Sequence, residues 1–198
     1  MEMTGEQRIA ASQEETWKAL NDPEVLKACI PGCESITLVN ENEYNVAMTS
    51  RIGPVSAKFR GRLQLSDIKP PHSYSLTFEG QGGAAGFAKG AAQVKLVPEH
   101  SETRLLYDVK ANVGGKLAQI GSRLIDAAAK KVADEFFTNF NQRMAASGDT
   151  TVISAPAQTD HPAAGPEPAM PSVSNTTLIF FAAGSLVVFI VALVTLFG

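Results

Sequence analysis

Alternation of apolar and polar side chains constrains the fold of this chain more than any other feature. Apolar residues occupy every second position in four stretches: Tyr44, Val46 and Met48; Val55, Ala57, Phe59, Leu63 and Leu65; Tyr74, Leu76 and Phe78; and Leu105, Tyr107, Val109 and Ala111. Successive side chains of a strand point to opposite faces, so each stretch is expected to be a strand with one buried and one wet face. Turn residues separate the stretches. The pattern predicts an antiparallel meander.

Residues 80–85 spell G-x-G-x-x-A, which matches a dinucleotide-binding turn. Such a turn requires a helix directly after the glycines, inside a parallel βαβ unit. Residues 86–97 instead contain two more glycines and then alternate, and the flanking strands are amphipathic. We therefore predict a hairpin, with the glycines at a bend or where a bulky side chain approaches the backbone.

Helical signals lie on both sides of the predicted sheet. After a short first strand over residues 7–11, Ser12 and Glu15 can form a capping box, and Pro23 can begin a second short helix. A long helix is predicted over residues 116–144. Its apolar stripe consists of Leu117, Ile120, Leu124, Ala128, Val132, Phe136 and Phe140. The many small residues of this helix leave room for a cavity between helix and sheet.

The end of the chain differs in composition from the rest. Residues 147–176 contain five prolines among Ala, Ser and Thr, which is typical of a disordered linker. Residues 177–197 carry no charge and would form a helix of roughly 30 Å, which matches the bilayer core. We predict a single transmembrane anchor there, the alternative being a buried core helix. The N-terminus shows no secretory signal, so residues 1–146 are expected on the cytoplasmic side of the inner membrane.

Charge and cysteine content narrow the function classes. All 17 Lys and Arg residues lie between Arg8 and Arg143, and only three of the 20 acidic residues lie beyond residue 148. The folded part is therefore nearly neutral, which argues against nucleic-acid binding. Cys29 and Cys33 flank an Ile-Pro-Gly turn without a nearby His, so two small apolar side chains are expected rather than a metal or redox site.

The predicted order is one strand, two short helices, about six further strands and a long C-terminal helix. It resembles the START-like, helix-grip superfamily, an α+β fold. Four stretches are similar to the CoxG family of carbon monoxide dehydrogenase accessory proteins: LKACIPGCE (26–34), GPVSAKFRG (53–61), GFAKG (86–90) and GGKLAQIGSRLID (114–126). The resemblance covers about residues 1–146.

This resemblance implies a curved antiparallel sheet of about seven strands wrapped on the long helix, with a pocket between them. It also implies an accessory role: bringing a molybdenum hydroxylase of the carbon monoxide dehydrogenase type to the inner membrane. A tethered pocket protein could present a respiratory quinone, menaquinone or ubiquinone, to such an enzyme. The family supplies no catalytic residue, and the spacing of polar residues suggests none, so we expect a protein that is not an enzyme.

Two sets of candidate residues follow. The predicted ligand-lining residues are Phe59, Phe78, Phe87, Tyr107, Leu117, Ile120 and Leu124, with Tyr107 as a hydroxyl donor. Lys58, Arg60 and Arg62, on the wet face of one strand, are the predicted partner-binding residues. Three alternatives stay open: simple core packing of the aromatic residues, a pure recruitment factor without a ligand, and a pocket enzyme.

Overall fold

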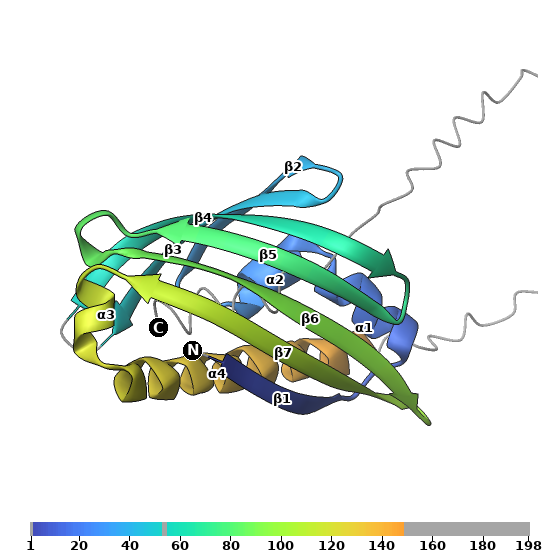
Figure 1. Cartoon of the computed structure of the whole chain (residues 1–198). Coiled ribbons are helices and arrows are strands. Elements are labelled where there is room, and N and C mark those ends of the chain that lie inside the picture. Colours follow the sequence, from blue (N-terminus) through green and yellow to red (C-terminus); the bar gives the residue numbers. More distant parts are fainter. Residues whose placement is uncertain (1, 53–54, 149–198) are drawn as a thin grey trace, which may run out of the picture.

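The computed structural model describes residues 2–52 and 55–148 (Figure 1). One antiparallel sheet has the strand order β1-β7-β6-β5-β4-β3-β2. The strands are β1 (Glu2–Ile9), β2 (Cys33–Asn40), β3 (Glu43–Ile52), β4 (Val55–Lys69), β5 (Ser73–Gln81), β6 (Phe87–Glu99) and β7 (Glu102–Gly114). The predicted α+β class and the antiparallel meander are confirmed. The first strand begins earlier than expected and pairs with the last, so β1 and β2 form the two edges of the sheet.

Four α-helices accompany the sheet in the described part of the chain: α1 (Gln13–Leu20), α2 (Pro23–Cys29), α3 (Lys116–Ile120) and α4 (Ser122–Gly148). The sheet curves around α4, while α1 and α2 lie toward one end of the molecule and α3 at the other (Figure 1). Asn139 of α4 donates to the carbonyl of Cys29 at 3.1 Å, which joins α4 to the end of α2.

The starts of both short helices follow from local sequence. The hydroxyl of Ser12 accepts from the backbone N–H of Glu15 at 3.3 Å, and the Glu15 carboxylate accepts from the N–H of Ser12 at 3.1 Å. These bonds satisfy backbone donors that a helix start leaves free, and the side-chain bond to Ser12 lowers the pKa of Glu15. Asp22 caps α2 in the same way, with Pro23 in its first turn. Both predicted caps are confirmed.

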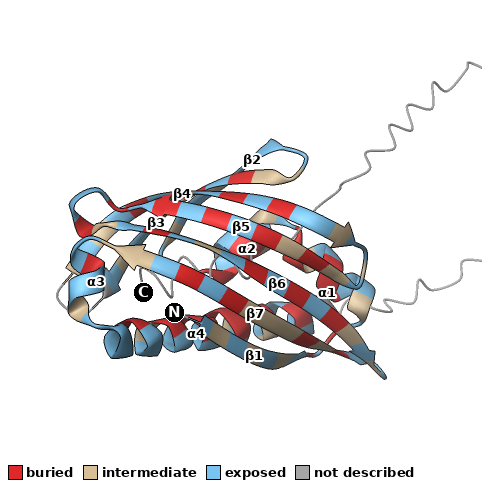
Figure 2. Cartoon of the chain, in the orientation of Figure 1, coloured by how far each residue is buried: buried red, intermediate tan, exposed pale blue. Residues whose placement is uncertain are grey.

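Burial alternates along the strands, as the sequence pattern predicts (Figure 2). The inner face of the sheet packs on α4, and the largest fully buried side chains include Tyr74, Phe59 and Leu63 from the sheet. The buried face of α4 consists of Ile125, Ala129, Val132, Ala133, Phe136, Phe137, Phe140 and Met144. Stacked and edge-on contacts join Phe136 to Phe140 and to Phe137, with ring centroids 5.6 and 5.1 Å apart.

The predicted continuous helix over residues 116–144 is wrong at Gly121. This residue has φ 97°, a conformation that L-residues rarely adopt, and it separates α3 from α4. The break changes which side chains face the sheet. Leu124, predicted within the apolar stripe, is 54% exposed, whereas its neighbour Ile125 is 5% exposed.

The glycine-rich stretch forms a hairpin, as predicted. Strands β5 and β6 pair antiparallel, from Ser73 opposite Lys95 to Gln81 opposite Phe87, and a single 3-10 turn, η1 (Gly83–Ala85), connects them. Gly82 is buried beneath the ring of Phe59, so a side chain at this position would overlap that ring. The glycines therefore allow a bend and a close approach, and the stretch is not part of a βαβ unit.

None of the described helices is long and apolar enough to span a membrane. The anchor predicted at residues 177–197 lies outside the described residues, as does the linker predicted at residues 147–176 apart from its first two positions, which end α4.

Candidate functional site

Five of the seven predicted ligand-lining residues lie on the inner side of the sheet or against α4. Phe59, Phe78 and Leu117 are at most 4% exposed. Tyr107 and Ile120 are half-buried and pack against the same core. The structure thus brings these five together around one apolar interior, although simple core packing would place them in the same way.

Tyr107 is the polar member of this group. Its ring stacks on Phe137 of α4, with centroids 5.8 Å apart and an interplanar angle of 20°, and lies over Gly5 of β1. Burial, with a smaller contribution from the nearby carboxylate of Asp134, raises the pKa of the Tyr107 phenol. The hydroxyl therefore stays protonated at neutral pH and can donate a hydrogen bond at the seam between β1 and α4.

Phe87 and Leu124 do not line the interior, which corrects their predicted placement. Phe87 begins β6 with its side chain on the outer face, is 46% exposed, and its ring lies against Gly114 of β7. Leu124 points outward because α4 starts afresh after Gly121.

Sequence reasoning missed a wall of small side chains inside the fold. Ala88 and Ala92 of β6, Ala111 of β7 and Ala133 of α4 are all at most 5% exposed. Alternation with Val94 and Leu96 already places Ala88 and Ala92 on the inner face. Such side chains fill little volume, so this part of the interior is bounded mainly by backbone and by neighbouring aromatic rings.

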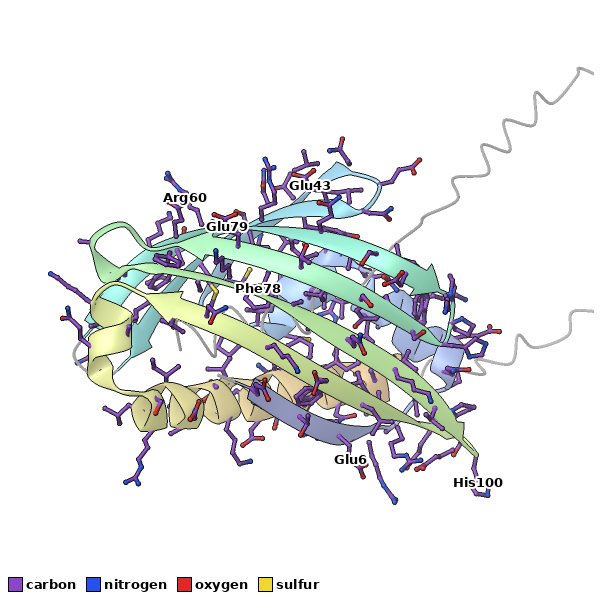
Figure 3. The ribbon with its side chains drawn as sticks, in the orientation of Figure 1. Glu6, Glu43, Arg60, Phe78, Glu79 and His100 are labelled. Atoms are coloured by element: carbon purple, nitrogen blue, oxygen red, sulfur yellow. The ribbon has the colours of Figure 1, made fainter. Side chains whose placement is uncertain are left out.

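The outer face of the sheet carries an open hollow of about 790 Å³. Its lining residues are Ser35, Thr37, Asn45, Val46, Ala47, Lys58, Arg60, Gly61, Arg62, Glu79, Gln81, Gly82 and Gly83. The three predicted partner-binding residues are all among them, and Figure 3 shows Arg60 and Glu79 on this outer side. We refer to this surface as the outer basin.

Two of its three cations are neutralised by neighbours. Lys58 forms a salt bridge with Glu34, and Arg62 Nε lies 2.8 Å from Glu43 Oε1. Hydrogen bonds, first from Lys58 and then from Thr49, lower the pKa of Glu34. Arg60 forms no salt bridge within residues 2–52 and 55–148, so it is the cation of the outer basin best able to accept a new anionic partner.

The remaining reactive groups lie in unreactive surroundings. Burial raises the pKa of Cys29, and it raises the pKa of Cys33 to about 11. No group of three or more His, Cys, Asp or Glu side chains that could hold a metal ion occurs in the described ranges. The two carboxylates with shifted pKa values, Glu15 and Glu34, lie at the surface.

Comparison with known proteins assigns this geometry to a family. The model of the carbon monoxide dehydrogenase family CoxG matches residues 5–145. A conserved protein from Geobacillus kaustophilus is 34% identical, with a TM-score of 0.71 over 74% of this chain and 97% of that chain. No curated protein matches the chain.

Two more distant structures share the fold alone. A START superfamily protein from Mycobacterium smegmatis is 14% identical, with a TM-score of 0.56 over 74% of this chain and 98% of that one. The Zhui aromatase/cyclase from Streptomyces sp. R1128 is 10% identical, with a TM-score of 0.57 over 76% of this chain and 96% of that one.

The START-like fold and the family match together indicate a ligand-binding accessory protein. The family model spans well over half of the chain, and the Geobacillus protein aligns over nearly its whole length. The chain belongs to the CoxG family of carbon monoxide dehydrogenase.

Proposed function

We propose that this protein is a membrane-anchored, non-enzymatic accessory protein that holds a respiratory quinone and recruits a molybdenum hydroxylase of the carbon monoxide dehydrogenase type. The observation that carries the ligand half is the apolar interior, where buried alanines adjoin aromatic rings and one protonated phenol. The family match supports the accessory role and the class of partner.

A quinone suits the chemistry of this interior. Its isoprenoid tail would lie against Ala88, Ala92 and Ala111, where burial of apolar surface contributes roughly 25 cal/mol per Å². Its ring carbonyl would accept a hydrogen bond from the hydroxyl of Tyr107. Either menaquinone or ubiquinone satisfies these requirements, because both combine a carbonyl headgroup with an apolar tail.

The end of the chain supports a place at the inner membrane, with the domain on the cytoplasmic side. Residues 177–197 are long enough for one span, and about 30 linker residues give a typical reach of about 30 Å. Fractionation of cells that produce the full chain, or a chain ending at Gly148, tests this directly. The full chain should resist carbonate extraction, and the shortened chain should be released; equal behaviour of the two would contradict the anchor.

The test of the ligand is lipid analysis of full-length protein purified from its own membranes in mild detergent. We expect about one quinone per chain by mass spectrometry, and less in the chain that ends at Gly148. Absence of quinone from both forms would overturn the ligand half of the proposal.

A matched pair of variants locates the ligand. Ala92→Leu adds volume on the inner face, where Ala92 is 3% exposed, whereas Ala91→Leu adds the same volume on the outer face. We expect the Ala92 variant to remain folded and lose its quinone, and the Ala91 variant to keep it. If both variants retain quinone, the interior is not the binding site.

A pure recruitment factor without a ligand is the second candidate. It is favoured by the outer basin, a hollow rich in polar and charged groups on the face away from α4. In that case quinone is absent while the hydroxylase still binds.

A further inference from the structure

A row of side chains crosses five strands on the outer face of the sheet. Strand register places Ser35, Ala47, Arg60, Gln81 and Phe87 opposite one another in turn, from β2 to β6. Ser35 and Ala47 are small, which leaves the outer basin open beside Arg60. We call these five residues the outer row.

Arg60 is the cation of the outer basin that forms no salt bridge among the described residues. Its neighbours along β4, Lys58 and Arg62, are held by Glu34 and Glu43. A guanidinium offers two parallel donors to one carboxylate, a geometry that an ammonium lacks. Of the three cations predicted from the sequence, Arg60 is therefore the one suited to bind a carboxylate from another molecule.

Phe87 supplies a rigid apolar contact at the end of the same row. Four large hydrophobic side chains of the described residues are exposed, and Phe87 is the aromatic one among them. Its ring lies against the backbone of Gly114, where a side chain would collide with it. A ring held in this way loses little conformational entropy on binding, and aromatic residues and arginine are enriched at protein interfaces.

The spacing of the two groups indicates the kind of partner. Arg60 and Phe87 stand two strands apart, about 10 Å at the usual separation of neighbouring strands. An extended segment spans that distance in about three residues. The basin between them is open and lined mainly by polar groups, so it suits a protein segment better than an enclosed small molecule.

We propose that the outer row is the docking surface for the hydroxylase, and that it receives a segment in which a carboxylate and a large apolar side chain lie about three residues apart. The carboxylate binds Arg60 and the apolar side chain packs on Phe87. This inference rests on the proposed recruitment function, and it leaves Lys58 and Arg62 as structural ion pairs of the sheet.

The test measures binding of the purified hydroxylase to the full chain in nanodiscs by biolayer interferometry. We expect Arg60→Glu and Phe87→Ala each to weaken binding by roughly tenfold or more. Arg8→Glu and Leu124→Ala are matched controls, because they make the same kinds of change at exposed positions outside the row. Both controls should bind within about twofold of the unaltered chain, and thermal unfolding checks that all four variants fold.

A photo-crosslinking residue placed at Gln81, between the two groups, identifies the occupant, with Gln93 as the matched position elsewhere on the outer face. Cross-links from position 81 to an acidic segment of the hydroxylase would support the inference. Hydroxylase binding that is unchanged by both row variants would overturn it and leave recruitment intact. Absence of binding by the unaltered chain would overturn recruitment as well. Cross-links only to a second copy, or to this chain's own residues beyond 148, would assign the row to that occupant instead.

Discussion

At the scale of single residues, aromatic rings decide where this sheet needs glycine. Gly82 lies beneath Phe59, and Gly5 lies beneath Tyr107. A close approach was predictable for residues 80–85, because the flanking strands are amphipathic and no helix follows. The ring responsible was not predictable, because Phe59 comes from another strand and only the folded sheet brings it over Gly82.

Substitution of Gly82 by alanine should lower the free energy of unfolding by about 1–3 kcal/mol, because the added methyl group overlaps the Phe59 ring. Phe59→Leu should reduce that penalty, so a double-mutant cycle measured by urea unfolding would show coupling between the two positions. Additive effects would mean that the cost comes from backbone conformation and not from the ring.

The thiol of Cys33 should react slowly near neutral pH. Burial raises its pKa to about 11 from an ordinary 9.0, and because only the thiolate reacts, a roughly hundredfold smaller fraction is reactive at pH 8. In a Cys29→Ala variant, the iodoacetamide alkylation rate should rise about tenfold per pH unit from pH 8 toward 11. A plateau below pH 9 would contradict the raised pKa.

At the scale of elements, period-two alternation predicted β3 to β7 because each has one wet face. The sequence also carried the correct side for Phe87: Lys89, Gln93 and Lys95 alternate with it and are exposed. The phase of α4 was harder to predict. Counting forward from Leu117 reaches Leu124, but Gly121 interrupts the helix, and counting back from Phe136 reaches Ile125. A glycine inside a helical pattern is only a weak signal of a break.

The phase of α4 can be tested with neighbouring truncations. Ile125→Ala should cost about 2–4 kcal/mol of unfolding free energy, because Ile125 is 5% exposed and its removal leaves a cavity. Leu124→Ala should change stability by no more than about 0.5 kcal/mol, since that side chain lies at the surface. The reverse order in chemical denaturation would restore the continuous helix predicted from the sequence.

At the scale of the whole molecule, the two ends of the domain hold each other. Strand β1 pairs with β7, from Glu2 opposite Lys110 to Ile9 opposite Thr103. Asn141 of α4 donates to the carbonyl of Arg8 at 3.0 Å and accepts from the N–H of Ala10 at 3.3 Å. The family resemblance implied that the sheet wraps around the helix, but these contacts could not be inferred from either segment alone.

Loss of the Asn141 bonds should therefore loosen β1. We expect Asn141→Ala to reduce the unfolding free energy by about 1–2 kcal/mol and to speed hydrogen exchange at Ala10. Thr138→Ala serves as the control, because its hydroxyl bonds only within α4, to the carbonyl of Asp134. Unchanged exchange at Ala10 would mean that strand pairing alone holds this end.

The pairing of β1 with β7 also sets an order of events during synthesis. The ribosome makes β1 first, yet its partner strand begins at Glu102 and the helix residue that fastens it is Asn141. A nascent chain consequently carries an unpaired first strand, and an uncovered apolar sheet face, until nearly the whole domain has been translated. Contacts between such distant segments form slowly, so this protein is expected to depend on chaperones that bind early in translation.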